Sequence, residues 1–145
     1  MKPVIALLFL AGLSAGCART EVAKPVSNPV AYVEIPVADM DRAVAFYETV
    51  FGADFTRETV DGYEMALFPY TEGAGGASAA LAKGDVYVPA KTGPIIYLAV
   101  DDIDAALTRA TARGAPILFE KKNVGHAIIA EIEDSEGNRI ALMQR

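Results

Sequence analysis

Two side-chain types that often carry acid–base or metal chemistry are scarce in this 145-residue chain, which holds one histidine and one cysteine. His126 is the only imidazole, and so a candidate general base or metal ligand. A lone histidine is more often structural, and one imidazole does not make a metal site. Glu34 follows Tyr32 by two residues in an alternating stretch, so both share one face of a strand. Glu34 and His126 are therefore weak catalytic candidates, and the catalytic residues stay unknown.

Other polar patterns do not support a catalytic site. Residues 73–76 (Gly-Ala-Gly-Gly) lack the preceding strand, the following helix and the Lys-Ser/Thr pair of a phosphate loop. Asp39 and Asp41, like Asp102 and Asp104, suit the start of a helix, where the helix dipole favours acidic residues. No serine stands in an arrangement with histidine and aspartate that suggests a nucleophile.

Length and charge narrow the function classes. The chain is long enough for one domain, and its formal net charge is −6, with 13 basic and 19 acidic residues. The basic residues are scattered, and Lys121 and Lys122 form the only adjacent pair in the body of the chain. A nucleic-acid partner would require a basic stripe, so we expect no nucleic-acid partner.

The N-terminal segment is separate from the domain. Residues 1–16 carry one lysine, an apolar run and then small residues, which predicts a signal peptide. Small residues ending at Cys17 resemble the bacterial lipoprotein signal, in which that cysteine is lipidated, although Ser14 stands where that family prefers leucine. A plain secretory signal that removes Cys17 is the alternative. The polar residues 17–29 are predicted to be a flexible tether.

This resemblance predicts the location of the protein. Lipidated Cys17 implies an exported protein anchored to a membrane of the bacterial cell envelope. Ala18 after the cysteine resembles the outer-membrane default, which favours the periplasmic face of the outer membrane. With its one cysteine used in this way, the chain has no partner for an internal disulfide.

The remaining residues, 30–145, repeat one pattern in two modules, at about 30–83 and 94–145. Each module is predicted to contain a strand, a helix and three more strands. The first helix begins after Asp39 and ends at Gly52, and the second begins after Asp102 and ends at Gly114. The expected strands are 30–35, 53–59, 63–69, 77–82, 94–100, 116–119, 127–133 and 139–144. A single module would bury too little surface for reliable stability, whereas two can cover each other's apolar faces.

This duplicated βαβββ pattern resembles the vicinal oxygen chelate superfamily, which contains glyoxalase I, extradiol dioxygenases, and fosfomycin and bleomycin resistance proteins. The stretches that carry the resemblance are 33–43 (VEIPVADMDRA), 46–47 (FY), 50–52 (VFG) and 134–142 (DSEGNRIAL). Together they are similar to the glyoxalase-like branch. The resemblance implies an α+β fold in which the two modules form an eight-stranded, U-shaped sheet around a cleft.

Metalloenzymes of this superfamily hold a divalent ion in the cleft with His, Glu or Gln ligands from the first and last strands of each module. The matching positions here are Tyr32, Ala80, Ile95 and Ala141. Alanine and isoleucine carry no donor atom, and a neutral tyrosine is a poor ligand for such ions. We therefore expect the usual metal site to be absent and predict no cofactor.

The polar groups expected in the cleft are Tyr32, Glu34, Glu64, Tyr97 and Arg139. A mostly apolar cleft with a few polar groups is typical of a small-molecule site. Equally, Tyr32 and Tyr97 could fill the space of the metal and hydrogen-bond to a partner such as Glu34.

Three functions remain open: a binding protein for a small organic ligand, a glyoxalase-type lyase or isomerase, and a membrane scaffold with a filled cleft. The lyase or isomerase would use acid–base residues alone or a metal at a relocated site. Glu34, Glu64 and His126 are the residues available for such a site, although their spacing does not predict one. Glu131 and Glu133 are expected to face solvent. A homodimer is possible.

Overall fold

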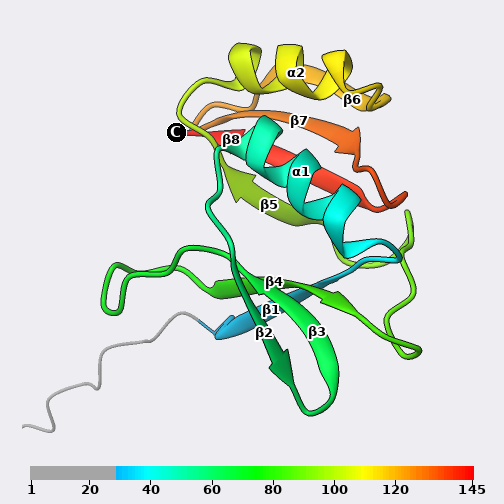
Figure 1. The fold of residues 1–145 in the computed structure, drawn as a ribbon. Coiled ribbons are helices and arrows are strands. Elements are labelled where there is room, and N and C mark those ends of the chain that lie inside the picture. Colours follow the sequence, from blue (N-terminus) through cyan, green and yellow to red (C-terminus); the bar gives the residue numbers. More distant parts are fainter. Residues whose placement is uncertain (1–28) are drawn as a thin grey trace, which may run out of the picture.

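The computed structural model describes residues 29–145, which form two helices and eight strands (Figure 1). The first module contains β1 (Tyr32–Pro36), α1 (Met40–Phe51), β2 (Thr56–Val60), β3 (Tyr63–Leu67) and β4 (Ser78–Lys83). The second contains β5 (Ile96–Ala99), α2 (Ile103–Ala112), β6 (Ile117–Asn123), β7 (Ile128–Glu133) and β8 (Arg139–Gln144). The signal peptide, Cys17 and all of the predicted tether except residue 29 lie outside the described residues. Within residues 29–145, no helix is long and apolar enough to cross a membrane.

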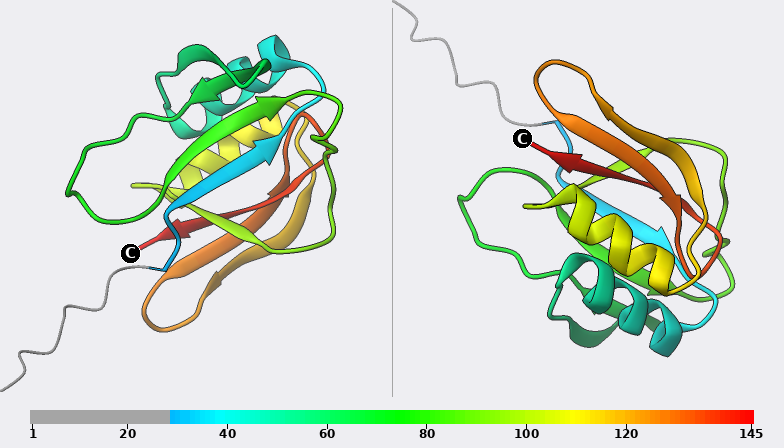
Figure 2. Two further views of the ribbon diagram at one scale, coloured as in Figure 1. Left: turned by 90° about the horizontal axis from the view of Figure 1, so that it is seen from below. Right: turned by 90° about the horizontal axis from the view of Figure 1, so that it is seen from above.

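The predicted α+β fold of two βαβββ modules is confirmed. The strands form two four-stranded sheets, with the orders β1-β4-β3-β2 and β5-β8-β7-β6, rather than one continuous hydrogen-bonded sheet. In each sheet the first strand of the module runs parallel to the last, and the other pairs are antiparallel. β1 and β5 are edge strands, and each lies on the side of its sheet that is turned toward the other sheet (Figure 2). The most visible difference from the sequence prediction is β6, which continues to Asn123 because it pairs along β7.

Local sequence explains the helix boundaries. Asp39 caps α1 and Asp102 caps α2, and each carboxylate accepts a hydrogen bond from the backbone amide three residues later. Gly52 ends α1 with a φ of 69°, a left-handed conformation that favours glycine. Asp61 and Gly62 also have positive φ, as the predicted two-residue hairpin between β2 and β3 requires.

Both helices cover the same side of the two sheets and pack against each other, with a shared core between them (Figure 2). Ile35, Leu81 and Ile140 are core residues that are at most 1% exposed. Because side chains alternate along a strand, the residues that directly precede Ile35 and Leu81, Glu34 and Ala80, project from the opposite face. We call this face of the two sheets, which points away from both helices, the open face.

Candidate functional site

A cavity of about 410 Å³ lies where β1, the start of β8 and the connection between the modules meet. Its lining is mostly apolar, and its few polar groups come from both modules and from the connection. The lining residues are Tyr32, Val33, Glu34, Ile35, Pro36, Val88, Ala90, Thr92, Pro94, Ile96, Asn138, Arg139 and Ile140. We call it the junction cavity.

Three of the five residues predicted for the cleft line the junction cavity. Tyr32 and Glu34 come from β1, and Arg139 is the first residue of β8. The Arg139 guanidinium is already bound, because its Nε and Nη2 donate to Glu131 Oε2 at 2.7 and 2.6 Å. Partial burial and then the nearby Glu34 carboxylate raise the pKa of the Tyr32 hydroxyl. Glu34 is the one acidic residue among those that line the cavity, so its carboxylate is the group that could bind a ligand there.

The other two predicted cleft residues lie elsewhere. Tyr97 projects from β5 into a separate hollow, of about 690 Å³, beside Gly76 and Ala77. The structure places Glu64 outside the cleft, because its cross-strand neighbour is Lys83 and it shares a strand face with the core residue Ala66. Glu64 thus projects from the helix side of its sheet.

Ion pairs confirm the outward position of Glu64. Its carboxylate lies 3.5 Å from Arg57 Nη1 and 3.4 Å from Lys83 Nζ. Arg57 also contacts Asp41 at the start of α1, at 2.6 Å. This network joins the sheet to its own helix and faces solvent, so Glu64 has no part in a site on the open face.

The structure also places His126 away from the cavity and corrects the prediction for Glu131. His126 is exposed in the turn between β6 and β7, at the end of β7 that pairs with Gln144 rather than with Arg139. It does not line the junction cavity, so Glu34 and His126 do not act as a pair. Glu131 is only 5% exposed, because it lies opposite Ala141 on the open face and binds Arg139 there.

Sequence reasoning missed Tyr87, which lies in the connection between the modules. Its hydroxyl donates to Glu34 Oε2 at 3.0 Å, and its ring meets that of Tyr63 edge to face, with centroids 5.3 Å apart. Burial, followed by the hydrogen bond to Glu34, raises the pKa of Tyr87. The apolar–aromatic–apolar run Val86-Tyr87-Val88 was the available signal. It sits in a turn-rich segment, which predicts a linker and not a contact.

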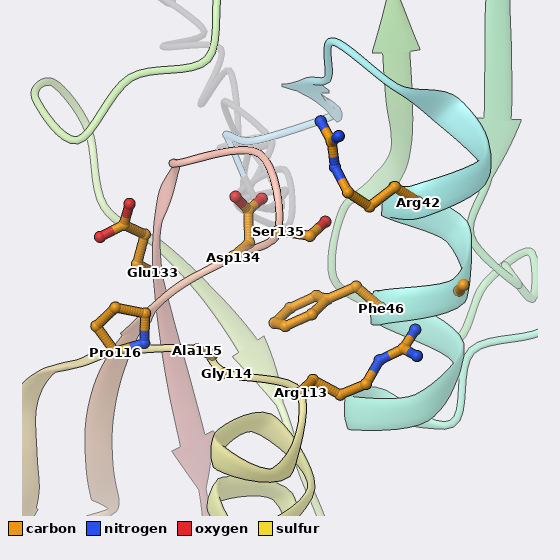
Figure 3. A pocket seen from close by; sticks show the side chains of 10 residues that line it. Arg42, Phe46, Arg113, Gly114, Ala115, Pro116, Glu133, Asp134 and Ser135 are labelled. Carbon is orange, nitrogen blue, oxygen red and sulfur yellow. The ribbon is translucent and has the colours of Figure 1, made fainter.

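A larger hollow, of about 700 Å³, lies on the helix side, between α1 and the connections that precede β6 and β8 (Figure 3). Arg42 and Phe46 reach it from α1, and Asp134 lies across from them. Arg42 is bound to Glu136, and Asp134 accepts the hydroxyl of Tyr47 at 2.7 Å. Two of its polar groups, Arg42 and Asp134, therefore hold the modules together, which makes it a weaker candidate than the junction cavity.

The residues present do not suit a divalent metal at the superfamily's four ligand positions. Ala80 and Ala141 are fully buried methyl groups, Ile95 precedes β5, and Tyr32 offers only a phenol oxygen. Across residues 29–145, no group of three or more His, Cys, Asp or Glu side chains is placed to hold a metal ion.

Known proteins resemble this chain over most of its length. Residues 30–142 match the family model of the glyoxalase/bleomycin resistance protein/dioxygenase superfamily. A lactoylglutathione lyase from Haemophilus influenzae is 28% identical over 123 residues, which cover 79% of this chain and 91% of that protein.

Two solved structures illustrate the range of similar proteins. TnmS3, an antibiotic-binding protein from Streptomyces sp. CB03234, is 26% identical with a TM-score of 0.58, over 83% of this chain and 98% of that one. Glyoxalase I from Zea mays shares the fold with a TM-score of 0.63 at 22% identity, and the match covers 80% of this chain but only 44% of that protein. The paired modules and the matched family model together show that the chain belongs to the glyoxalase/bleomycin resistance protein/dioxygenase superfamily.

Proposed function

We propose that this protein binds a small organic molecule in the junction cavity without using a metal ion. The observation that carries the proposal is the composition of that cavity, in which apolar side chains surround Tyr32, Glu34 and Arg139. Pockets of this kind, a few hundred Å³ in volume and with few polar groups, are typical of small-molecule sites. The similarity to an antibiotic-binding protein gives independent support for a binding role.

The proposal includes loss of the superfamily's metal site and export of the protein. The side chains at positions 32, 80, 95 and 141 support the first point, because three of the four are hydrocarbon. The segment 1–16 and Cys17 support the second, with a lipid anchor on the periplasmic face of the outer membrane. Labelling with a palmitate analogue tests the anchor, since Cys17→Ser should remove the label and release the protein from membranes.

Ligand binding is tested with the purified domain and a library of small molecules. A compound that binds in the junction cavity should raise the melting temperature and shift the NMR signals of the lining residues. Thr92→Trp places a large side chain at the exposed rim of the cavity and should weaken binding at least tenfold. Val86→Trp is the matched control, because Val86 lies in the same connection, is 64% exposed and does not line the cavity. Equal loss in both variants, or no ligand at all, would contradict the proposal.

A lyase or isomerase of the glyoxalase type is the second candidate, favoured by the similarity to lactoylglutathione lyase over most of both chains. Such activity would require a divalent metal at another place or acid–base catalysis by residues such as Glu34. The test measures formation of lactoylglutathione from methylglyoxal and glutathione after loading with Ni²⁺ or Zn²⁺, together with the metal content after dialysis. A stoichiometric metal with turnover would establish the enzyme and overturn the metal-free proposal.

A further inference from the structure

The charges around the junction cavity do not balance. Arg139 is bound to Glu131, and Lys91, on the connection beside the cavity, has its Nζ 2.6 Å from Glu133 Oε2. These pairs neutralise the basic groups near the cavity. Glu34 has no ion-pair partner among residues 29–145, and the only hydrogen bond found there for its carboxylate comes from the neutral hydroxyl of Tyr87. Its Oε1 atom is left without a partner in the same part of the chain. The cavity therefore carries one uncompensated negative charge.

Two tyrosines, Tyr32 and Tyr87, lie near this carboxylate. Tyr32 projects from the same face of β1 as Glu34 and is 46% exposed, so its ring is accessible from the cavity. Tyr87 approaches Glu34 from the connection and packs against Tyr63. A carboxylate combined with an accessible tyrosine ring attracts a positive charge twice, through the charge itself and through the electron-rich face of the ring.

We propose that the ligand of the junction cavity is an organic cation, a substituted or quaternary ammonium compound, with Glu34 as its counter-charge and the ring of Tyr32 against its flank. This inference rests on the proposed binding function and specifies its ligand class. A neutral ligand would cover the Glu34 carboxylate and remove it from water without compensation, which is unfavourable. An anionic ligand would be repelled. The apolar walls formed by Val88, Pro94 and Ile96 suit the hydrocarbon part of such a cation.

Three probes with one benzyl body and different charges test the ligand class: benzyltrimethylammonium, benzyl alcohol and phenylacetate. In NMR titrations at low ionic strength, benzyltrimethylammonium should bind at least tenfold more tightly than benzyl alcohol, and phenylacetate most weakly. Binding of the cation should also weaken with added salt, because part of its affinity is electrostatic. Equal affinities for the cation and the alcohol would overturn the inference.

Variants identify the residues that select the charge. Glu34→Gln keeps an acceptor for Tyr87 but removes the charge. It should weaken binding of the cation at least tenfold and should not weaken binding of benzyl alcohol, because covering a neutral amide costs less than covering a carboxylate. Glu58→Gln, on the exposed strand β2, is the charge control and should change neither. Tyr32→Phe should retain binding of the cation, whereas Tyr32→Leu should weaken it about two- to fivefold.

The outcomes separate this inference from the proposed function. Suppose benzyl alcohol binds, Thr92→Trp prevents its binding, and Glu34→Gln has no effect on any probe. The junction cavity is then a ligand site without charge selection, so the inference fails and the proposed function stands. If the only ligands found in the library are neutral or anionic, the inference also fails. If neither the probes nor the library bind, both fail.

Discussion

The two helices begin in the same way but are attached to the rest of the molecule differently. Asp39 and Asp102 adopt nearly the same extended backbone conformation and cap α1 and α2 with hydrogen bonds of 3.0 and 2.9 Å. Beyond this shared cap, the start of α1 is bound by the other module, since Glu136 Oε2 accepts from the amides of Ala38 and Asp39 at 3.0 Å each. The start of α2 is bound by its own module, because Gln144 Oε1 accepts from the Ile103 amide at 2.9 Å.

The turn between β7 and β8 accounts for most of the difference between the attachments of α1 and α2. Its carboxylates bind α1 through Arg42, whose Nε lies 2.8 Å from Glu136, and through the buried hydroxyl of Tyr47, which donates to Asp134. Asn138 in the same turn donates to the carbonyl of Pro36 at 2.8 Å. The duplicated sequence thus builds each module, whereas residues that occur in only one copy hold the two modules together.

Asp134 is expected to give the largest effect on stability. Its carboxylate is 5% exposed and accepts hydrogen bonds from Tyr47 and from the amides of Glu136 and Asn138. Asp134→Ala would leave these buried donors without partners, and should lower the free energy of unfolding by about 3 kcal/mol in urea titrations. Thr71→Ala, in the exposed connection between β3 and β4, is the matched control and should change it by less than about 0.5 kcal/mol.

Tyr47→Phe separates the hydrogen bond from the packing of the ring. It removes only the hydroxyl, and Asp134 keeps its other donors, so the expected loss is about 1 kcal/mol. In the Asp134→Ala background, Tyr47→Phe should lower the free energy of unfolding little further, because the hydroxyl it removes has already lost its acceptor. Full additivity of the two changes would show that the contact between the modules at this turn does not depend on their hydrogen bond.

Sequence patterns predicted what is local. Periodicity and capping residues identified both helices, and β8 was predicted with its observed bounds, because each depends on neighbours within a few residues. The same reasoning placed Tyr32 and Glu34 together on one strand face. It could not predict the contact of Tyr87 with Glu34, which joins residues 53 positions apart through an irregular segment.

The errors at Glu64 and Glu131 have one physical origin. Strand alternation fixes which residues share a face, but not whether that face meets a helix, a second sheet or solvent. Glu131 shares a face with Ala141, which the family resemblance assigned to the cleft, yet Glu131 was expected to be solvated. Arg139, eight residues away, supplies the opposite charge that offsets the cost of burying this carboxylate.

Acid should loosen the contact of Glu136 with the start of α1. Burial alone raises the pKa of the Glu136 carboxyl, but hydrogen bonds from Arg42, the Asp39 amide, Ser135 and the Ala38 amide outweigh it and hold the pKa below its ordinary value. The ionised form is therefore favoured by folding. Its contribution is complete above the ordinary glutamate pKa of about 4.3, and is lost as the pH falls through the lowered value.

Glu136→Gln removes the charge of this side chain and most of its pH dependence. At pH 7 it should lower the free energy of unfolding by about 1.5 kcal/mol, because charge-assisted hydrogen bonds become neutral ones. The difference between wild type and variant should shrink as the pH falls below the ordinary glutamate pKa of about 4.3. Glu58→Gln serves again as the exposed control. Parallel pH profiles for the wild type and Glu136→Gln would refute the role assigned to the ionised carboxylate.

The smallest effect is expected at the start of α2, where the acceptor is neutral. Gln144→Met keeps the length of the side chain and removes the oxygen that binds the Ile103 amide, so the loss should be about 0.7 kcal/mol. Because neither partner titrates, this loss should be the same at pH 7 and at pH 4. If Gln144→Met instead destabilised the protein more than Glu136→Gln at pH 7, attachment within a module would outweigh attachment between modules. The contrast between the two helix starts would then be one of geometry only and not of energy.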